Sequence, residues 1–257
     1  MATGQIDLTG KVALVCGSGG GGVGDATARG LAQAGATVFA VDRTEELLTT
    51  TMDELRQLGA KVDGLVADLR VADQVDDIVP AALKAFQRID LVTNIAGGTQ
   101  QGESFGIAET PRDVFRRVMA LNFDYVFQVC GQAGAAMISQ GGGGSIVNIS
   151  SVSGVRAAPN HAVYGAAKAA VIAATRSMAI EWGAHNIRAN VVVPGAVATA
   201  RAGDRAKRFE ELAPLKRPAS PQDIANAILF LFSDLSAGIT GQEIVVDTGL
   251  TAKSVTG

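Results

Sequence analysis

Residues 12–33 read VALVCGSGGGGVGDATARGLAQ, which is a short β-type run, a glycine-rich loop and an Ala-rich segment. The apolar run at 12–15 is typical of a buried strand, and a helix is expected over residues 25–33. A dinucleotide site requires this order, because glycines let the backbone approach a pyrophosphate and the helix N-terminus offers free N–H groups. The glycine run matches G-x-G-x-x-G trivially, so the flanking segments carry the prediction. The alternative is a flexible glycine loop.

The next strand is expected over residues 37–41 and ends at Asp42. An acidic residue about 20 positions after such a loop can accept hydrogen bonds from the adenosine ribose and would repel a 2′-phosphate. Arg43 follows at once and could instead bind that phosphate, but the glycine loop holds no Lys or Arg. The sequence therefore favours NAD over NADP. Alternatively, Asp42 only caps the helix that begins near Thr44.

Strands and helices alternate about seven times along the chain, which predicts an α/β fold with a Rossmann-type, doubly wound parallel sheet and helices on both faces. Residues 1–257 are expected to form one domain, because no second core, linker or repeat is visible. A helix over residues 71–87 should be kinked or broken at Pro80. A second long helix should start with Thr110 as N-cap and Pro111 at the first position, and run to about Met137. A ligand should bind at the carboxyl ends of the strands.

A second stretch, residues 151–168, reads SVSGVRAAPNHAVYGAAK and follows an apolar run at 144–150. The run predicts a buried strand that ends at Ser151, and an Ala-rich helix follows Tyr164. Tyr164 and Lys168 are four apart and so share one helix face. Tyrosine is a poor base at neutral pH, but a neighbouring ammonium favours the phenolate, so Tyr164 could take a proton from an alcohol. A packed Tyr beside a surface Lys is the alternative, since the pair is common by chance.

Ser151, Tyr164 and Lys168 at these spacings resemble the short-chain dehydrogenase/reductase family, whose Tyr-x-x-x-Lys begins thirteen positions after a Ser. The resemblance runs from Lys11 to about Leu250. It implies Asn122, Ser151, Tyr164 and Lys168 as catalytic residues, with Tyr164 as general acid/base. Asn122 would bend its helix and hold a water that connects to the Lys.

The resemblance also implies the residues that bind the cofactor, with some departures from the family pattern. Cys16 replaces the Thr of T-G-x-x-x-G-x-G, the glycine loop is one residue longer, and Ile95 replaces the second Asn of N-N-A-G. The implied NAD-binding residues are Gly17, Ser18, Gly22, Val23, Gly24, Asp42, Arg43, Asp68, Leu69, Asn94, Ala96, Gly97, Tyr164, Lys168, Pro194, Gly195, Val197 and Thr199.

The substrate pocket should be flanked by small or polar residues and covered by a lid at about residues 200–217. The predicted pocket residues are Gly98, Thr99, Gln100, Ser153, Asn160 and His161. Cations of the lid such as Arg205 would suit a compact substrate with hydroxyls or a carboxylate. These charges could instead form a solvated helix face, and Phe209 and Leu212 could favour an apolar alcohol or a steroid.

The composition of the chain limits the kinds of partner and the compartment that we expect. A formal net charge of −3 disfavours nucleic acid, no run of 18 apolar residues suggests a membrane span, and no secretion signal is visible. Two cysteines form no disulfide framework or metal-ligand spacing, so cytoplasm and no metal are expected. The apolar helices at 118–137 and 162–182 predict a homotetramer or homodimer.

Two classes of function therefore remain. The first is an NAD(H)-dependent oxidoreductase that acts on a secondary alcohol or ketone. Within it, a 3-oxoacyl-thioester reductase is an alternative, although the resemblance associates such enzymes with NADPH. The second class is a non-catalytic NAD-sensing protein.

Overall fold

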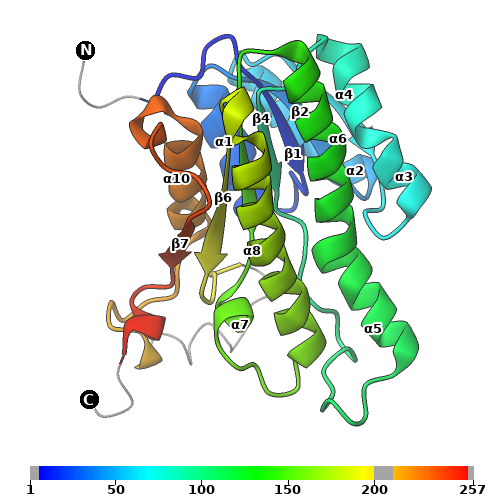
Figure 1. Ribbon diagram of the computed structural model, residues 1–257, viewed down its shortest axis with the longest axis vertical. Helices are drawn as coiled ribbons and strands as arrows, with labels where there is room; N and C mark the ends of the chain where they lie inside the picture. The colour runs from blue at the N-terminus through cyan, green and yellow to red at the C-terminus, as the bar shows by residue number, and fades with distance from the viewer. Residues whose placement is uncertain (1–5, 200–210, 254–257) are drawn as a thin grey trace.

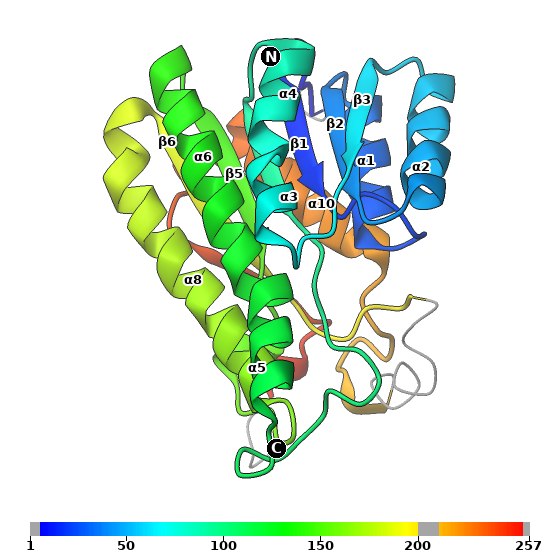
Figure 2. The ribbon, with the colours of Figure 1, turned by 90° about the vertical axis from the view of Figure 1, so that its right-hand side faces the viewer.

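Seven parallel strands form one sheet in the computed structural model, which describes residues 6–199 and 211–253 (Figures 1 and 2). The strand order is β3-β2-β1-β4-β5-β6-β7, so the chain winds outward from β1 in one direction and then from β4 in the other. The predicted doubly wound parallel fold is confirmed. The strands are β1 (Val12–Cys16), β2 (Thr37–Asp42), β3 (Val62–Val66), β4 (Leu91–Asn94), β5 (Gly144–Ile149), β6 (Ile187–Pro194) and β7 (Glu243–Val246).

Helices cover both faces of this sheet. On one face α1, α2 and α10 pack against a core that includes Leu31, Leu55 and Ile228. On the other face α3, α4, α6 and α8 pack against a second core. The helices are α1 (Val23–Gln33), α2 (Glu45–Gln57), α3 (Ala72–Asp76), α4 (Ile78–Phe86), α5 (Arg112–Met119), α6 (Tyr125–Gln140), α7 (Val152–Val155), α8 (Ala162–Trp182) and α10 (Pro221–Phe232).

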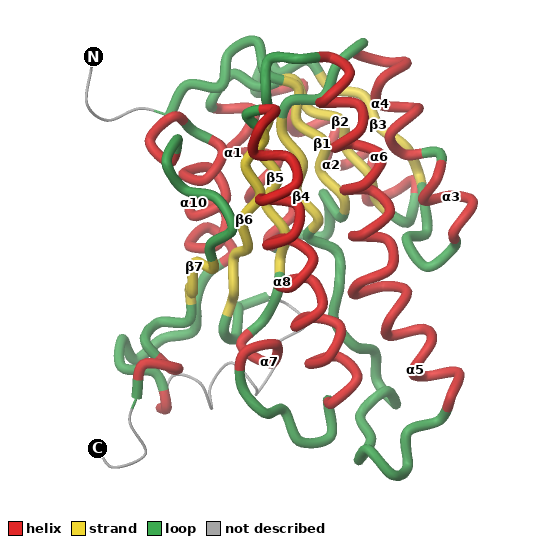
Figure 3. The backbone as a smooth tube through the Cα atoms, in the orientation of Figure 1, coloured by secondary structure: helices red, strands yellow, loops and turns green. Residues whose placement is uncertain are grey.

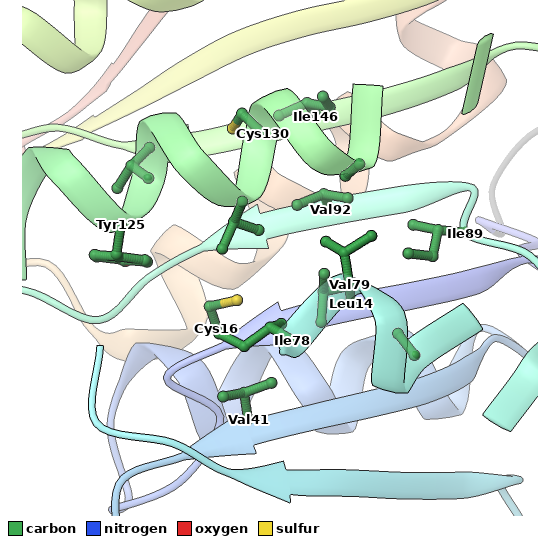
Figure 4. Packing of buried hydrophobic residues seen from close by; sticks show 14 of the residues in the cluster. Leu14, Cys16, Val41, Ile78, Val79, Ile89, Val92, Tyr125, Cys130 and Ile146 are labelled. Carbon is green, nitrogen blue, oxygen red and sulfur yellow. The ribbon is translucent and has the colours of Figure 1, made fainter. Parts of the chain in front are cut away.

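Strand β1 shows why the central strands are apolar without alternation. Leu14 and Cys16 point into the core beneath α4 and α6, which Figure 4 shows, whereas Ala13 and Val15 point into the opposite core. Successive side chains of a strand face opposite sides, and both sides are covered by helices here. All five residues of β1 are therefore buried.

Two helix boundaries differ from the sequence-based expectation. The predicted helix over 71–87 is divided at Asp77 into α3 and α4, and Pro80 lies in the first turn of α4, where no intrahelical N–H is needed. The N-cap of α5 is Pro111 and not Thr110, whose hydroxyl donates a hydrogen bond to the Gly106 carbonyl at 2.8 Å. Thr110 therefore closes the preceding turn and leaves the helix to begin at Arg112.

The long helix expected to end near Met137 is interrupted by a π-helical segment, Ala120–Asp124. A π segment inserts one extra residue into the helix and shifts the side chains that follow it. Asn122 occupies the middle of this segment and is buried. α6 then continues to Gln140, three residues beyond the predicted end.

None of the helices in the described part of the chain is both long enough and apolar enough to cross a membrane.

Candidate functional site

A cavity of about 390 Å³ opens at the carboxyl ends of the strands, among the loops after β1, β4, β5 and β6. Figure 3 shows in green the loops that connect the strands and helices. The volume of the cavity is within the range of small-molecule sites. The residues predicted for cofactor and catalysis that line it are Gly17, Gly22, Val23, Gly24, Asp42, Arg43, Asp68, Leu69, Ala96, Gly97, Ser151, Tyr164, Lys168, Pro194, Gly195, Val197 and Thr199. The topology thus brings together residues that lie up to 182 positions apart in the chain.

The glycine loop turns tightly between β1 and α1. A Cβ on Gly24 would lie only 1.7 Å from the Gly17 carbonyl oxygen, so the start of α1 can pack on the loop only with glycine at this position. Gly20 and Gly21 have φ of 84° and 65°, in the left-handed region, and they accommodate the additional residue of the loop. The lengthened loop therefore keeps α1 directed at the cavity.

Asp42 holds this loop against the end of β2. One carboxylate oxygen accepts a hydrogen bond from the Gly19 N–H at 2.8 Å, and the other accepts from the Arg43 N–H at 2.7 Å. Each carboxylate oxygen can accept further hydrogen bonds. Asp42 can thus order the loop and still receive hydroxyl groups from the cavity that it lines.

A second acid lies at the same end of the cavity. Asp68 forms two hydrogen bonds with the Arg70 guanidinium, at 2.9 and 2.5 Å. The hydrogen bond from Arg70 holds the pKa of the Asp68 carboxyl below its usual range. Arg70 was not among the predicted residues, although its position two residues after Asp68 was a usable clue. With Arg43 it places two cations along the cavity wall.

The N-terminus of α1 provides the donors that an anion needs. Gly22 is the N-cap and contributes no side-chain cap to the first N–H groups. A helix N-terminus carries a partial positive charge and free N–H groups, which suits a pyrophosphate. A close-approach glycine, uncapped helix donors and an acid at the end of β2 together fit a dinucleotide cofactor.

Ser151, Tyr164 and Lys168 line the opposite part of the cavity. Ser151 is the N-cap of α7, and its hydroxyl accepts a hydrogen bond from the Ser153 N–H at 3.1 Å. The Lys168 Nζ lies 5.8 Å from the centroid of the Tyr164 ring. The spacing of four residues on α8 therefore places the ammonium beside the phenol, as expected.

Lys168 is buried and tied to the end of β5. Its Nζ donates to the Ile149 carbonyl at 3.0 Å, and its own carbonyl accepts from the Ser150 hydroxyl at 2.8 Å. Burial lowers the pKa of Lys168 to about 8, so the side chain is still mostly protonated at pH 7. A protonated Lys168 can stabilise negative charge on the neighbouring phenol oxygen.

Asn122 does not line the cavity but shapes its wall. Its side-chain oxygen accepts from the Gly98 N–H at 2.7 Å, and its amide donates to the Gly98 carbonyl at 2.9 Å. The amide also donates to the Val118 carbonyl at 2.9 Å. A Cβ on Gly97 would lie 2.9 Å from both Asn122 Oδ1 and Lys168 Nζ, so these side chains converge on that glycine. Asn122 thus clamps the loop that follows β4.

Two predicted cofactor residues lie in the core and not in the cavity. The Ser18 hydroxyl donates to the Val41 carbonyl at 3.3 Å. The Asn94 amide donates to Asn148 Oδ1 at 2.9 Å and to the Cys130 sulfur at 3.3 Å, which links β4 to β5 and α6. Burial raises the pKa of Cys130 to about 12, so this thiol stays protonated. Both polar side chains therefore link the strands that surround the cavity and do not point into it.

Of the residues predicted to bind substrate, only Gly98 lines this cavity. Asn160 and His161 pair with the loop before α5 through an isolated bridge between Phe105 and His161. The Ser104 hydroxyl also donates to the Asn160 carbonyl at 3.1 Å. Ser153 lines a separate, smaller cavity, and the Gln100 N–H donates to Glu103 at 2.8 Å.

Most of the proposed lid, residues 200–210, lies outside the described residues. Of its described part, Leu212 is exposed. Several cavity residues were not predicted, and most are chain neighbours of predicted ones. Leu47, which lies on α2, had no local clue. The additional residues are Gly19, Gly20, Leu47, Ala67, Arg70, Ile95, Leu121, Ile149 and Ser150.

Comparison with known proteins gives matches over nearly the whole chain. Residues 19–251 match a family model described as enoyl-(acyl carrier protein) reductase. The chain is 38% identical to 3-oxoacyl-[acyl-carrier-protein] reductase FabG of Thermotoga maritima, over 95% of this chain and 98% of that protein.

Solved structures also match nearly the whole chain. Carveol dehydrogenase from Mycobacterium avium in complex with NAD has a TM-score of 0.89 at 30% identity, covering 96% of this chain and 99% of that one. A 7α-hydroxysteroid dehydrogenase complexed with NADH and 7-oxo glycochenodeoxycholic acid also has a TM-score of 0.89 at 30% identity, covering 95% and 96%.

Proposed function

The chain belongs to the short-chain dehydrogenase/reductase family of oxidoreductases, and on that premise we propose that it interconverts a secondary alcohol and a ketone with NAD(H). The observation that carries the proposal is the placement of Ser151, Tyr164 and Lys168 in one cavity with the glycine loop and Asp42.

Tyr164 is the proposed general acid/base. Its phenol oxygen would take the proton from the substrate hydroxyl during oxidation and return it to the carbonyl oxygen during reduction. Lys168, buried and cationic at neutral pH, would stabilise the phenolate. The Ser151 hydroxyl would hold the substrate oxygen by a hydrogen bond, and the clamp of Asn122 on Gly98 would keep the wall of the site in place.

NAD is the proposed cofactor, and when bound it supplies or accepts the hydride at C4 of its nicotinamide ring. The N–H groups at the start of α1 would bind the pyrophosphate. The Asp42 carboxylate would accept hydrogen bonds from the adenosine ribose and repel a 2′-phosphate. Two of the similar structures, the carveol and the 7α-hydroxysteroid dehydrogenases, contain NAD or NADH and support this choice.

Reduction of a 3-oxoacyl thioester is the second candidate, because the chain is 38% identical to the Thermotoga maritima reductase. Arg43 and Arg70 favour this second candidate, because both line the cavity and would bind the 2′-phosphate of NADPH. The negative charge of Asp42 at the same end of the cavity opposes that phosphate. A wild-type preference for NADPH and an acyl thioester would replace our first proposal by this one.

The test is Tyr164→Phe, assayed at 340 nm with a panel of secondary alcohols and ketones. We expect turnover to be abolished while NAD binding, measured by calorimetry, stays nearly intact, since only the proton carrier is removed. Lys168→Ala should weaken both. A Tyr164→Phe variant that kept a tenth of the wild-type kcat would refute the mechanism, and a wild type that binds NAD without turnover would favour the NAD-sensing alternative.

A further inference from the structure

A second cavity, of about 270 Å³, lies beside α7 and is lined by Ser153, Arg156, Thr251 and Lys253, among others. Its charged residues are both cations, and its polar residues both carry hydroxyl groups. Apolar contacts come from residues such as Val152 and Leu250. A hollow with two cations, two hydroxyls and no lining carboxylate has the donor set for an oxyanion.

Neither cation is neutralised within the described residues. Arg156 donates weakly to two carbonyls, those of Val155 at 3.2 Å and Thr251 at 3.4 Å, and neither Arg156 nor Lys253 forms an ion pair there. The nearby Asp247 carboxylate is used to order the segment after β7, which contains Thr251. Its oxygens accept from the Gly249 N–H at 2.9 Å and the Thr251 N–H at 2.6 Å, so its hydrogen bonds go to the backbone.

The second cavity adjoins the proposed active site through one short helix. Ser151 caps the start of α7 and lines the main cavity, whereas Ser153 and Arg156 follow it into the second one. The Ser151 hydroxyl and the Ser153 N–H are joined by a hydrogen bond of 3.1 Å. Val152, the residue directly after Ser151, already lines the second cavity, so the walls of the two cavities are one residue apart, or about 3.8 Å between Cα atoms.

We propose that this second cavity binds the carboxylate or phosphate of the substrate, with Arg156 and Lys253 as its partners. The inference rests on the proposed function, because the reacting carbon is placed at Ser151 and Tyr164. The substrate class would then be a short hydroxy or oxo compound with an anionic group a few bonds from the reacting carbon. A guanidinium can bind such a group through two parallel N–H bonds, which also fixes the orientation of the substrate.

The first arm of the test measures anion binding without catalysis. Inorganic phosphate is titrated by calorimetry at constant ionic strength into the wild type, Arg156→Gln and Lys253→Gln. Arg116→Gln is the matched control, because Arg116 is an exposed cation on α5. We expect Arg156→Gln to weaken phosphate binding about tenfold or more and the control to leave it unchanged. Equal phosphate binding by all four proteins would overturn the site.

The second arm distinguishes an anion of the substrate from a free anion. The ratio of kcat/KM for 3-hydroxybutyrate to that for its neutral amide is measured in the same four proteins. We expect the wild type to prefer the acid, and Arg156→Gln to lose about tenfold on the acid and nothing on the amide. Phosphate binding that depends on Arg156 without any preference for the acid would overturn the substrate assignment in favour of a free-anion site. Absence of turnover with a whole panel of alcohols would refute the proposed function, while the phosphate titration would still decide the anion site.

Discussion

Asp42 combines two tasks in one side chain, since it lines the proposed ribose subsite and also accepts the Gly19 N–H. We predict that Asp42→Ala raises the NADP-to-NAD ratio of kcat/KM by tenfold or more, because the charge that repels a 2′-phosphate is lost and Arg43 can meet it. Asp42→Asn is the control for loop order, since its amide oxygen can still accept from Gly19. A wild-type preference for NADP would contradict the prediction.

The buried ammonium of Lys168 predicts a pH dependence of stability. Burial lowers its pKa from 10.5 to about 8, so between these values the unfolded chain binds more protons than the folded one. The contribution of Lys168 to the free energy of unfolding therefore rises with pH from about 8 to about 10.5 and is constant below that window. We expect the stability difference between wild type and Lys168→Met to shift in favour of the wild type across that window.

Denaturant unfolding at closely spaced pH values checks the Lys168 prediction. Burial raises the pKa values of the Cys16 and Cys130 thiols, so these groups lower the free energy of unfolding as the pH rises. Their contribution is the same in both proteins and cancels when the two free energies of unfolding are subtracted. A stability difference that does not change between pH 7.5 and 10.5 would show that the ammonium is not desolvated in the folded protein.

At the scale of elements, α10 depends on its N-terminal cap. The Ser220 hydroxyl accepts from the Asp223 N–H at 3.1 Å, and the Asp223 carboxylate accepts from the Ser220 N–H at 2.8 Å, which completes a capping box. We predict that Ser220→Ala lowers the free energy of unfolding by about 1 kcal/mol, whereas Ser220→Thr has a much smaller effect. Equal stability of all three proteins in urea unfolding would show that the cap contributes nothing.

The π segment between α5 and α6 is the other element with a local function. It turns Asn122 inward, where the side chain binds both backbone groups of Gly98. A regular helix across Ala120–Asp124 would rotate the residues that follow by about one position. The distortion of the helix is thus part of how the wall beside Lys168 is held.

At the scale of the whole molecule, α5, α6 and α8 carry apolar side chains that the sheet does not cover. Phe115, Phe127 and Ile180 are 47%, 55% and 84% exposed. We predict a homotetramer, or at least a homodimer, through these helices, because their small residues permit close approach across a two-fold axis. Light scattering at micromolar concentration should give a multiple of the 26.3 kDa chain.

The combined substitution Phe127→Glu and Ile180→Glu should reduce the mass of that assembly. Leu58→Glu is the matched control, since Leu58 is 44% exposed at the C-cap of α2, which covers the opposite face of the sheet. A wild-type mass of one chain at micromolar concentration would contradict the predicted assembly.

The sequence by itself determined the architecture and the family. Continuous apolar strands, alternating helices and the glycine loop predict a doubly wound parallel sheet, because each pattern follows from local periodicity and backbone freedom. The positions of Ser151, Tyr164 and Lys168 were also predictable, since the strand end and the helix spacing of four are local features. An interruption of the helix over residues 71–87 was predictable from Pro80 alone, although the structure places it at Asp77.

Only the tertiary structure decided which polar side chains reach the cavity. Asn94 ends β4 and Ser18 follows β1, yet their hydrogen-bond partners, Asn148 and Val41, come from neighbouring strands and hold both side chains in the core. Arg156 and Lys253 are 97 positions apart and line one hollow only because the segment that follows β7 lies against α7. The physical reason is that local patterns fix which way a backbone runs, whereas the partners of a side chain depend on segments that the fold brings from elsewhere in the chain.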